Sequence, residues 1–233
     1  KNGLVITKTA NVYVPGAVPA ALTGGVTRGI SLANAGDTVN VSAGSFSDNV
    51  VVNQRVTLDG AGSGTDGTVI TASSAATSVV TVTGSGSADS RLIVKDMRLL
   101  GATGASGILV GNSTAASKLT FDNVYASGNT DGISIGGTAA TSDVIISNST
   151  LSSNANNGLR VASATPSLDG LTVSNCTIAS NQYQGFSYNA NGSNVIGTNF
   201  SFTDTTFTNN CASNANSGGN HDLSFFGFKG NAS

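Results

Sequence analysis

A repeat of 25 to 29 residues runs through most of the chain and constrains the fold more than any other feature. Five six-residue segments align without gaps: 92–97 (LIVKDM), 119–124 (LTFDNV), 144–149 (VIISNS), 171–176 (LTVSNC) and 200–205 (FSFTDT). Each alternates apolar and variable residues and then carries Asp or Asn, which is the pattern of a strand with one buried face. A fixed period of this length predicts a solenoid.

The second half of the repeat is equally regular. Another Asn follows six residues after the Asp or Asn of each segment, at Asn129, Asn154, Asn181 and Asn210, and Ala102 takes its place in the first copy. A glycine and a second alternating strand come next, at 107–110, 132–135, 158–161 and 185–188. We expect these glycines to serve tight corners. We also expect the asparagines to form stacked ladders.

Stacked turns place residues of equal phase above one another, about 4.8 Å apart. The expected inward stacks are Leu92, Leu119, Val144 and Leu171, with Val94, Phe121, Ile146 and Val173 beside them, and Ile108, Ile133, Leu159 and Phe186 in the second strand. One polar ladder is expected where the first strand bends, at Asp96, Asn123, Asn148, Asn175 and Asp204. Asn suits a bend because it tolerates left-handed backbone and bonds to nearby main chain.

The predicted fold class is all-β, a single-stranded right-handed parallel β-helix with a short N-terminal cap. Residues 1–34 are expected to form an N-terminal strand, near residues 12–14, and the cap, a short helix or loop over 20–34. Residues 35–233 form the β-helix, with a C-terminal coil that is open or continued. The alternatives are a leucine-rich repeat and a helical solenoid, but the sequence lacks both the LxxLxL pattern and helical periodicity.

Composition narrows the function classes. Charged residues make up 9% of the chain, the net charge is −2, and Lys and Arg form no cluster that would hold a phosphate backbone. No apolar run has the length of a membrane helix. We therefore expect neither nucleic-acid binding nor membrane insertion, and the low charge favours a secreted or cell-surface location. Cys176 and Cys211 leave a disulfide and two buried thiols equally open, and their spacing is not that of a zinc site.

Residues 35–62, AGDTVNVSAGSFSDNVVVNQRVTLDGAG, resemble the entry segment of pectate-lyase-like right-handed parallel β-helix proteins. Residues 92–210 resemble their generic coils, so the resemblance covers most of the chain. It implies the fold. It implies no single activity, because the superfamily includes lyases, hydrolases, esterases, phage spikes, adhesins and inert scaffolds.

Catalytic candidates are few. Asn129-Thr130-Asp131 resembles the first element of the polygalacturonase pattern, but Asn156-Asn157 stands where that family has an Asp pair, and neither Gly-His-Gly nor Arg-x-Lys follows. Inverting hydrolysis needs two carboxylates, one as acid and one as base. Asp131 is the single weak catalytic candidate, and we expect it to be a turn residue. His221 is the only histidine, which excludes His-based triads and His-rich metal sites.

Other candidate sites involve binding. Calcium could use Asp59 and Asp66 in a glycine-rich loop, although a plain loop is the simpler interpretation, and no other cofactor is expected. Tyr125 and Tyr183 are the candidate glycan contacts. An outward row of mixed Thr and Ile in the first strand, one residue wide, is the only hint of ice binding. Phe225, Phe226 and Phe228 are expected either to plug the last coil or to form an assembly edge.

These observations predict a non-catalytic extracellular or cell-surface protein that is structural, fibre-forming or adhesive. Its expected partners are a second copy, joined end to end, or an extracellular polysaccharide. One alternative is a carbohydrate-active enzyme or a degenerate polysaccharide lyase or hydrolase. A further alternative is a module that binds polysaccharide or ice.

Overall fold

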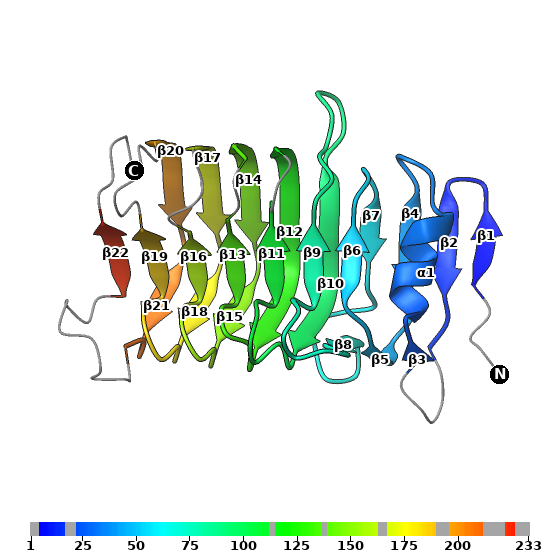
Figure 1. Ribbon diagram of the computed structural model, residues 1–233, viewed down its shortest axis with the longest axis horizontal. Helices are drawn as coiled ribbons and strands as arrows, with labels where there is room; N and C mark the ends of the chain where they lie inside the picture. The colour runs from blue at the N-terminus through cyan, green and yellow to red at the C-terminus, as the bar shows by residue number, and fades with distance from the viewer. Residues whose placement is uncertain are drawn as a thin grey trace.

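The protein is a parallel β-helix, a solenoid of about six turns in which 52% of residues are in strands and 4% in a helix. The computed structural model describes residues 5–16, 22–111, 115–136, 139–162, 167–189, 196–211 and 222–226. The turns stack along the long axis of the molecule, with β1 at one end and β20, β21 and β22 at the other (Figure 1). The fold class predicted from the repeat is confirmed.

The larger sheet has fifteen strands and bends into two arms. Its first arm runs in the order β1 (Ile6–Lys8), β2 (Asn11–Val14), β4 (Thr38–Val41), β7 (Thr57–Asp59), β10 (Leu92–Leu100), β12 (Ala116–Ser127), β14 (Thr141–Ser147), β17 (Ser167–Ser174) and β20 (Ile196–Thr203). Its second arm holds β3 (Leu22–Thr23), β5 (Gly44–Ser47), β8 (Thr68–Thr71), β15 (Thr150–Ser152), β18 (Thr177–Ala179) and β21 (Thr206–Thr208). The long strands β10 and β12 continue from one arm into the other.

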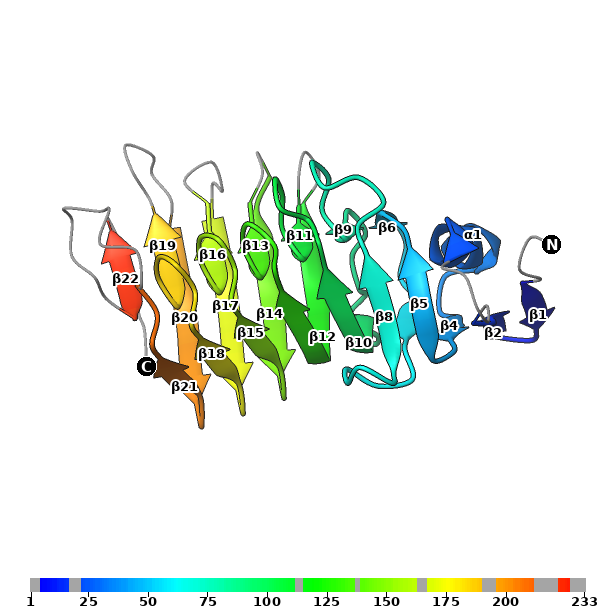
Figure 2. The ribbon, with the colours of Figure 1, turned by 90° about the horizontal axis from the view of Figure 1, so that it is seen from below.

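The smaller sheet has seven parallel strands, in the order β22 (Leu223–Phe226), β19 (Phe186–Asn189), β16 (Leu159–Val161), β13 (Ile133–Ile135), β11 (Ile108–Val110), β9 (Val80–Val82) and β6 (Val50–Val52). Helix α1 (Gly25–Leu32) lies beyond β6, at the N-terminal end of this sheet (Figure 2). It buries Val26 and Ile30 against the first turns. The segment 20–34, expected to be a short helix or loop, thus contains a helix, and β2 covers the strand expected near residues 12–14.

The core is the set of inward stacks between the sheets. Strand registers pair Leu92 with Leu119, Leu119 with Val144, and Val144 with Leu171, and these side chains are at most 1% exposed. The second-strand stack of Ile108, Ile133, Leu159 and Phe186 is paired and buried in the same way. Burying one such side chain contributes about 1.5–3 kcal/mol, so the stacks hold the turns together. The stacking predicted from the repeat is confirmed.

Glycine is required before the second strand because a side chain there would clash with the neighbouring turn. The φ angles of these glycines are not in the left-handed region, contrary to what a tight-corner role would favour. A Cβ atom on Gly158 would lie 2.3 Å from Cγ2 of Ile178, and one on Gly132 would lie 2.5 Å from the carbonyl oxygen of Gly158. The corner of each turn thus packs directly against the next turn, and only glycine fits there.

Candidate functional site

The bend of the first strand is a column of residues in left-handed backbone, which we call the outer bend column. Its members are Asp96, Asn123, Asn148, Asn175 and Asp204, with φ between 49° and 57°. Left-handed backbone costs most L-residues about 1–2 kcal/mol, and Asn and Asp tolerate it best. Asn148, Asn175 and Asp204 are exposed. The repeated Asn or Asp of the motif therefore turns the chain from the first arm into the second.

Two further left-handed columns flank the outer bend column. One interrupts the first strand at Lys118, Asp143, Gly170 and Asn199, and the other ends the second arm at Gly101, Gly128, Ser153, Ser180 and Asn209. Neither column was expected from the sequence, since its members share no residue type. Ser153 and Ser180 occupy a conformation that the equivalent Gly101 and Gly128 adopt without a steric cost.

The second set of repeated asparagines forms a buried asparagine ladder inside the solenoid, made of Asn129, Asn154, Asn181 and Asn210. Asn154 shows the pattern: its Oδ1 accepts from the backbone N–H of Asn129 at 3.2 Å, and its Nδ2 donates to Oδ1 of Asn181 at 2.9 Å. Its Nδ2 also donates to the carbonyl of Ala126 at 3.2 Å. Asn129, Asn154 and Asn181 are at most 1% exposed. These amides join successive turns where no strand pairing does.

Asp131, the catalytic candidate, lies in a second buried polar stack, immediately before Gly132. Its side chain is 3% exposed. Its Oδ1 accepts from the backbone N–H of Asn157 at 3.1 Å and from Nδ2 of Asn157 at 2.9 Å. Its Oδ2 lies 3.4 Å from a guanidinium nitrogen of Arg160. Asn157 in turn accepts from the backbone N–H of Gln184 at 3.3 Å. The carboxylate is thus bonded along the solenoid axis, in the place an amide takes one turn later.

The exposed face of the second arm carries a row that the sequence analysis overlooked, which we call the threonine row. Strand registers place Thr150, Thr177 and Thr206 side by side on β15, β18 and β21. Thr177 and Thr206 are exposed. A sequence signal existed, because each threonine lies two residues after the Asn or Asp of the outer bend column.

Tyr125 continues the threonine row onto β12. It pairs with Thr150 on one side and with Arg98 on the other, and the Arg98 guanidinium lies over its ring, 3.8 Å from the centroid. The Ser152 hydroxyl donates to the Tyr125 hydroxyl at 3.3 Å, and this bond, followed by smaller effects of Ser127 and Arg98, lowers the pKa of the phenol despite partial desolvation. An aromatic ring, a cation and a line of hydroxyls therefore share one half-exposed strip. Tyr183 is half-buried in the turn before β19, away from this strip in the strand pairing.

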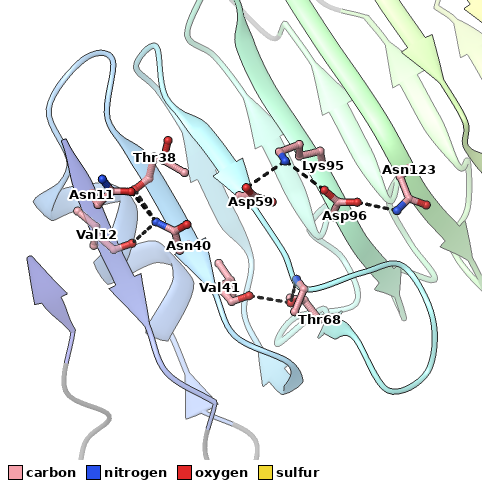
Figure 3. Close-up of polar contacts among 11 residues, drawn as sticks. Asn11, Val12, Thr38, Asn40, Val41, Asp59, Thr68, Lys95, Asp96 and Asn123 are labelled. Carbon is pink, nitrogen blue, oxygen red and sulfur yellow. Dashed lines mark hydrogen bonds and ion pairs between the residues drawn. The ribbon is translucent and has the colours of Figure 1, made fainter. Parts of the chain in front are cut away.

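The two calcium candidates have different surroundings. Asp59 lies at the end of β7, where its Oδ2 is 3.0 Å from Nζ of Lys95 (Figure 3). The same ammonium lies 3.2 Å from Oδ2 of Asp96, whose Oδ1 accepts from Asn123. The hydrogen bond to Asp59 raises the pKa of Lys95. The ammonium group of Lys95 therefore supplies a positive charge between the carboxylates of Asp59 and Asp96. Asp66 is exposed in the loop after β7.

A second ionic cluster joins three turns on the first arm. Nζ of Lys118 lies 2.6 Å from Oδ2 of Asp143, and a guanidinium nitrogen of Arg91 lies 2.8 Å from Oδ1. These contacts, the one with Lys118 first, lower the pKa of Asp143. The described residues include no group of three or more His, Cys, Asp and Glu side chains that could hold a metal ion.

The two cysteines and the C-terminal aromatic residues are the remaining residues that the sequence singled out. Cys176 and Cys211 do not form a disulfide; Cys176 is buried, and this desolvation raises the pKa of its thiol, whereas Cys211 is half-buried. Strand β22 contains Phe225 and Phe226, but their side chains, like all of Phe228 and His221, lie outside the described residues.

No family model, no curated protein and no solved structure matches the chain. Among the described residues, no helix combines the length and apolarity needed to cross a bilayer.

Proposed function

We propose that this protein is a structural and adhesive β-helix of an extracellular or cell surface, and that it works without catalysis. The observation that carries the proposal is the half-exposed strip of the second arm, in which Arg98, Tyr125 and the threonine row lie in register. Rows of hydroxyls can hydrogen-bond a polysaccharide that runs along the solenoid, and the tyrosine ring adds apolar contact area. The rigid stacking of turns keeps these groups in place before binding, which reduces the ordering cost.

The surroundings of Asp131 support the non-catalytic part of the proposal. A general acid or base must reach the proton that it transfers, within about 2.6–3.2 Å. The Asp131 carboxylate is instead buried and bonded to Asn157 and Arg160. We further propose that the chain is a distant member of the pectate-lyase-like superfamily, a relationship that its stacked parallel coils and the entry segment at 35–62 support.

Sedimentation with insoluble polysaccharides tests the proposal. We expect the wild-type protein to sediment with at least one polysaccharide, and Tyr125→Ala or Thr177→Lys to reduce the bound fraction several-fold. Val51→Ala, an exposed position on the smaller sheet, is the matched control and should leave binding unchanged. Equal binding by all variants would contradict the proposed strip, and no binding to any polysaccharide would contradict the adhesive role.

An activity assay on the same polysaccharides tests the alternative. We expect neither new reducing ends nor unsaturated products to accumulate with the wild-type protein. Depolymerisation that Asp131→Asn abolishes would replace the proposal with the enzymatic alternative. Asn is the matched substitution because Asn157 fills the equivalent position of the next turn.

A further inference from the structure

Within the described residues, each end of the solenoid presents a strand that pairs on one side only, and both strands belong to the larger sheet. Among the described strands, β1 pairs only with β2, and β20 pairs only with β17. In the second arm, β21 likewise pairs only with β18. Strands with a free edge are templates for pairing with another chain. Figure 1 shows these strands at opposite ends of the long axis.

Exposed apolar side chains also gather at the ends. Among the described residues, the exposed large hydrophobics are Ile6, Tyr13, Leu32, Val51 and Leu223. The first three lie on β1, β2 and α1, which together form the N-terminal cap of the solenoid, and Leu223 lies on β22 in the last turn. Phe202 and Phe207 of the last turn are only partly buried, whereas Val173 and Ile178, their register partners one turn earlier, are fully buried. The last turn therefore leaves partly uncovered the apolar positions that the turn before it buries.

Charge differs in sign between the ends. Residues 1–37 contain three cationic residues, Lys1, Lys8 and Arg28, against one acidic residue, Asp37. Residues 161–233 contain Asp169, Asp204 and Asp222 against a single cation, Lys229. Hydrogen bonds from Thr198 and then Asn199 lower the pKa of Asp169. Like ends therefore repel and unlike ends attract.

A groove marks the N-terminal end as the receiving surface. It has a volume of about 630 Å³ and is lined by residues 7–12 together with Leu32, Asn34 and Asp37. Strand β1 forms one wall of the groove and is exposed along its whole length. Because β1 is antiparallel to β2, and β2 and β20 run in the same direction through the parallel sheet, β20 of another copy would meet β1 as an antiparallel strand.

We propose that the protein assembles head to tail, with the acidic C-terminal turn of one copy docking on the basic N-terminal cap of the next. The occupant of the N-terminal groove is a second copy of this chain, and β20 extends the sheet by pairing with β1. Such an interface is heterologous and does not close by two-fold symmetry, so it propagates into a filament. Lys8 on the outermost strand discourages pairing with basic or neutral edges and favours the acidic end. This inference rests on the structural role proposed above and supplies its partner.

Light scattering across a concentration series, with electron microscopy of the same samples, tests the assembly. We expect the average mass to rise several-fold above the 23.0 kDa of one chain at low salt, and to fall when salt screens the charged ends. Straight filaments one solenoid wide should accompany the larger mass. A mass of one chain at all concentrations and salt levels would overturn the proposal, as would a plateau at twice the mass of one chain.

Charge reversal at each end identifies the interface. Lys8→Glu and Asp204→Lys should each raise the concentration needed for assembly by about tenfold or more. A 1:1 mixture of the two variants should restore assembly, because each variant keeps one wild-type end and supplies the complement of the other's reversed end. Asp66→Lys, the same change in the exposed loop between β7 and β8, is the matched control and should assemble like the wild type. If Asp66→Lys weakens assembly equally, or if the mixture stays dispersed, the end-to-end interface is wrong.

The Asp204 variants are expected to fold, because the substituted residues are compatible with the backbone at this position. Lys118 adopts φ of 56° in another left-handed column, so lysine is compatible with the backbone of Asp204, where φ is 49°. Asp204→Asn removes the charge while keeping a residue type found at Asn175, and it should weaken assembly less than Asp204→Lys does. The polysaccharide sedimentation separates the two proposals: a single chain that binds polysaccharide overturns assembly alone, and filaments that bind none overturn adhesion alone.

Discussion

The buried asparagine ladder and the outer bend column repeat with the same period and share Asn as their main residue, with Asp at Asp96 and Asp204 of the column, yet the two positions have different structural roles. In the buried asparagine ladder, the side-chain amide of Asn154 bonds to two neighbouring turns and is 1% exposed. In the outer bend column, Asn175 is exposed and has φ of 52°. The first position needs the amide and the second needs the backbone conformation. The same residue type can thus recur in a repeat for two unrelated reasons, and substitutions at the two positions can distinguish them.

The largest effect is expected from Asn154→Leu, in the buried asparagine ladder. The backbone N–H of Asn129 and the carbonyl of Ala126 lose their bonds to this amide inside the solenoid. Unsatisfied buried groups cost about 1–3 kcal/mol each, so we expect the free energy of unfolding to fall by about 2–4 kcal/mol. Denaturant unfolding measures it. A loss below about 1 kcal/mol would mean that the ladder amides are replaceable.

The next largest loss of unfolding free energy is expected from substitutions of Asn175 in the outer bend column. Valine is strained in left-handed backbone, so Asn175→Val should cost about 1–2 kcal/mol. Asn175→Gly keeps access to that backbone and should change the free energy of unfolding by only a few tenths of a kcal/mol. The two variants lose the same amide group. If they unfold at the same denaturant concentration, the amide and not the backbone conformation decides this position.

A smaller effect is expected from Asp143→Asn, which removes a charge from a third left-handed column without changing the preference for φ of 51°. Its ion pairs with Lys118 and Arg91 are partly exposed, so we expect a loss of about 0.2–1 kcal/mol at neutral pH.

The pH dependence of this variant has a definite sign. Because the pKa of Asp143 is lowered in the folded state, the pairs stabilise the protein above the unfolded-state value of 3.8, and this contribution disappears as the pH falls through the lower folded value. Unfolding curves of wild type and variant should therefore converge in acid. A difference that persists below the folded pKa would point to packing as the cause.

The smallest effect is expected from Ser180→Gly. Ser180 has φ of 57° directly before Asn181, where earlier turns have Gly101 and Gly128. Relief of the left-handed strain outweighs the greater chain entropy of glycine by a narrow margin, so we expect a gain of about 0.5 kcal/mol. Thermal and denaturant unfolding of Ser180→Ala provide the comparison, since alanine keeps the strain. A gain for alanine equal to that for glycine would exclude backbone strain as the cause.

Much of the fold could be predicted because equivalent positions of the repeat carry the same kinds of residue. Alternating apolar residues predict the inward stacks, and recurring Asn predicts polar ladders. The columns at Ser153 and Asp143 could not be predicted in this way, since their members share a backbone conformation and no chemistry. The threonine row has a constant spacing from Asn148, Asn175 and Asp204, but it was not expected because alternating apolar residues mark only two strands in each turn.

The sequence by itself determined the period, the inward residues, the polar ladders and the N-terminal cap, because local alternation and residue size decide which side chains can stack. Only the tertiary structure decided which asparagines are buried, that Asp131 bonds along the axis to Asn157, and that Lys95 lies between Asp59 and Asp96. These features arise from contacts between residues about one turn or more apart, and their geometry depends on how the turns are aligned. The same alignment brings Arg98, Tyr125 and the threonine row into one strip, and it separates the basic cap from the acidic last turn along the axis.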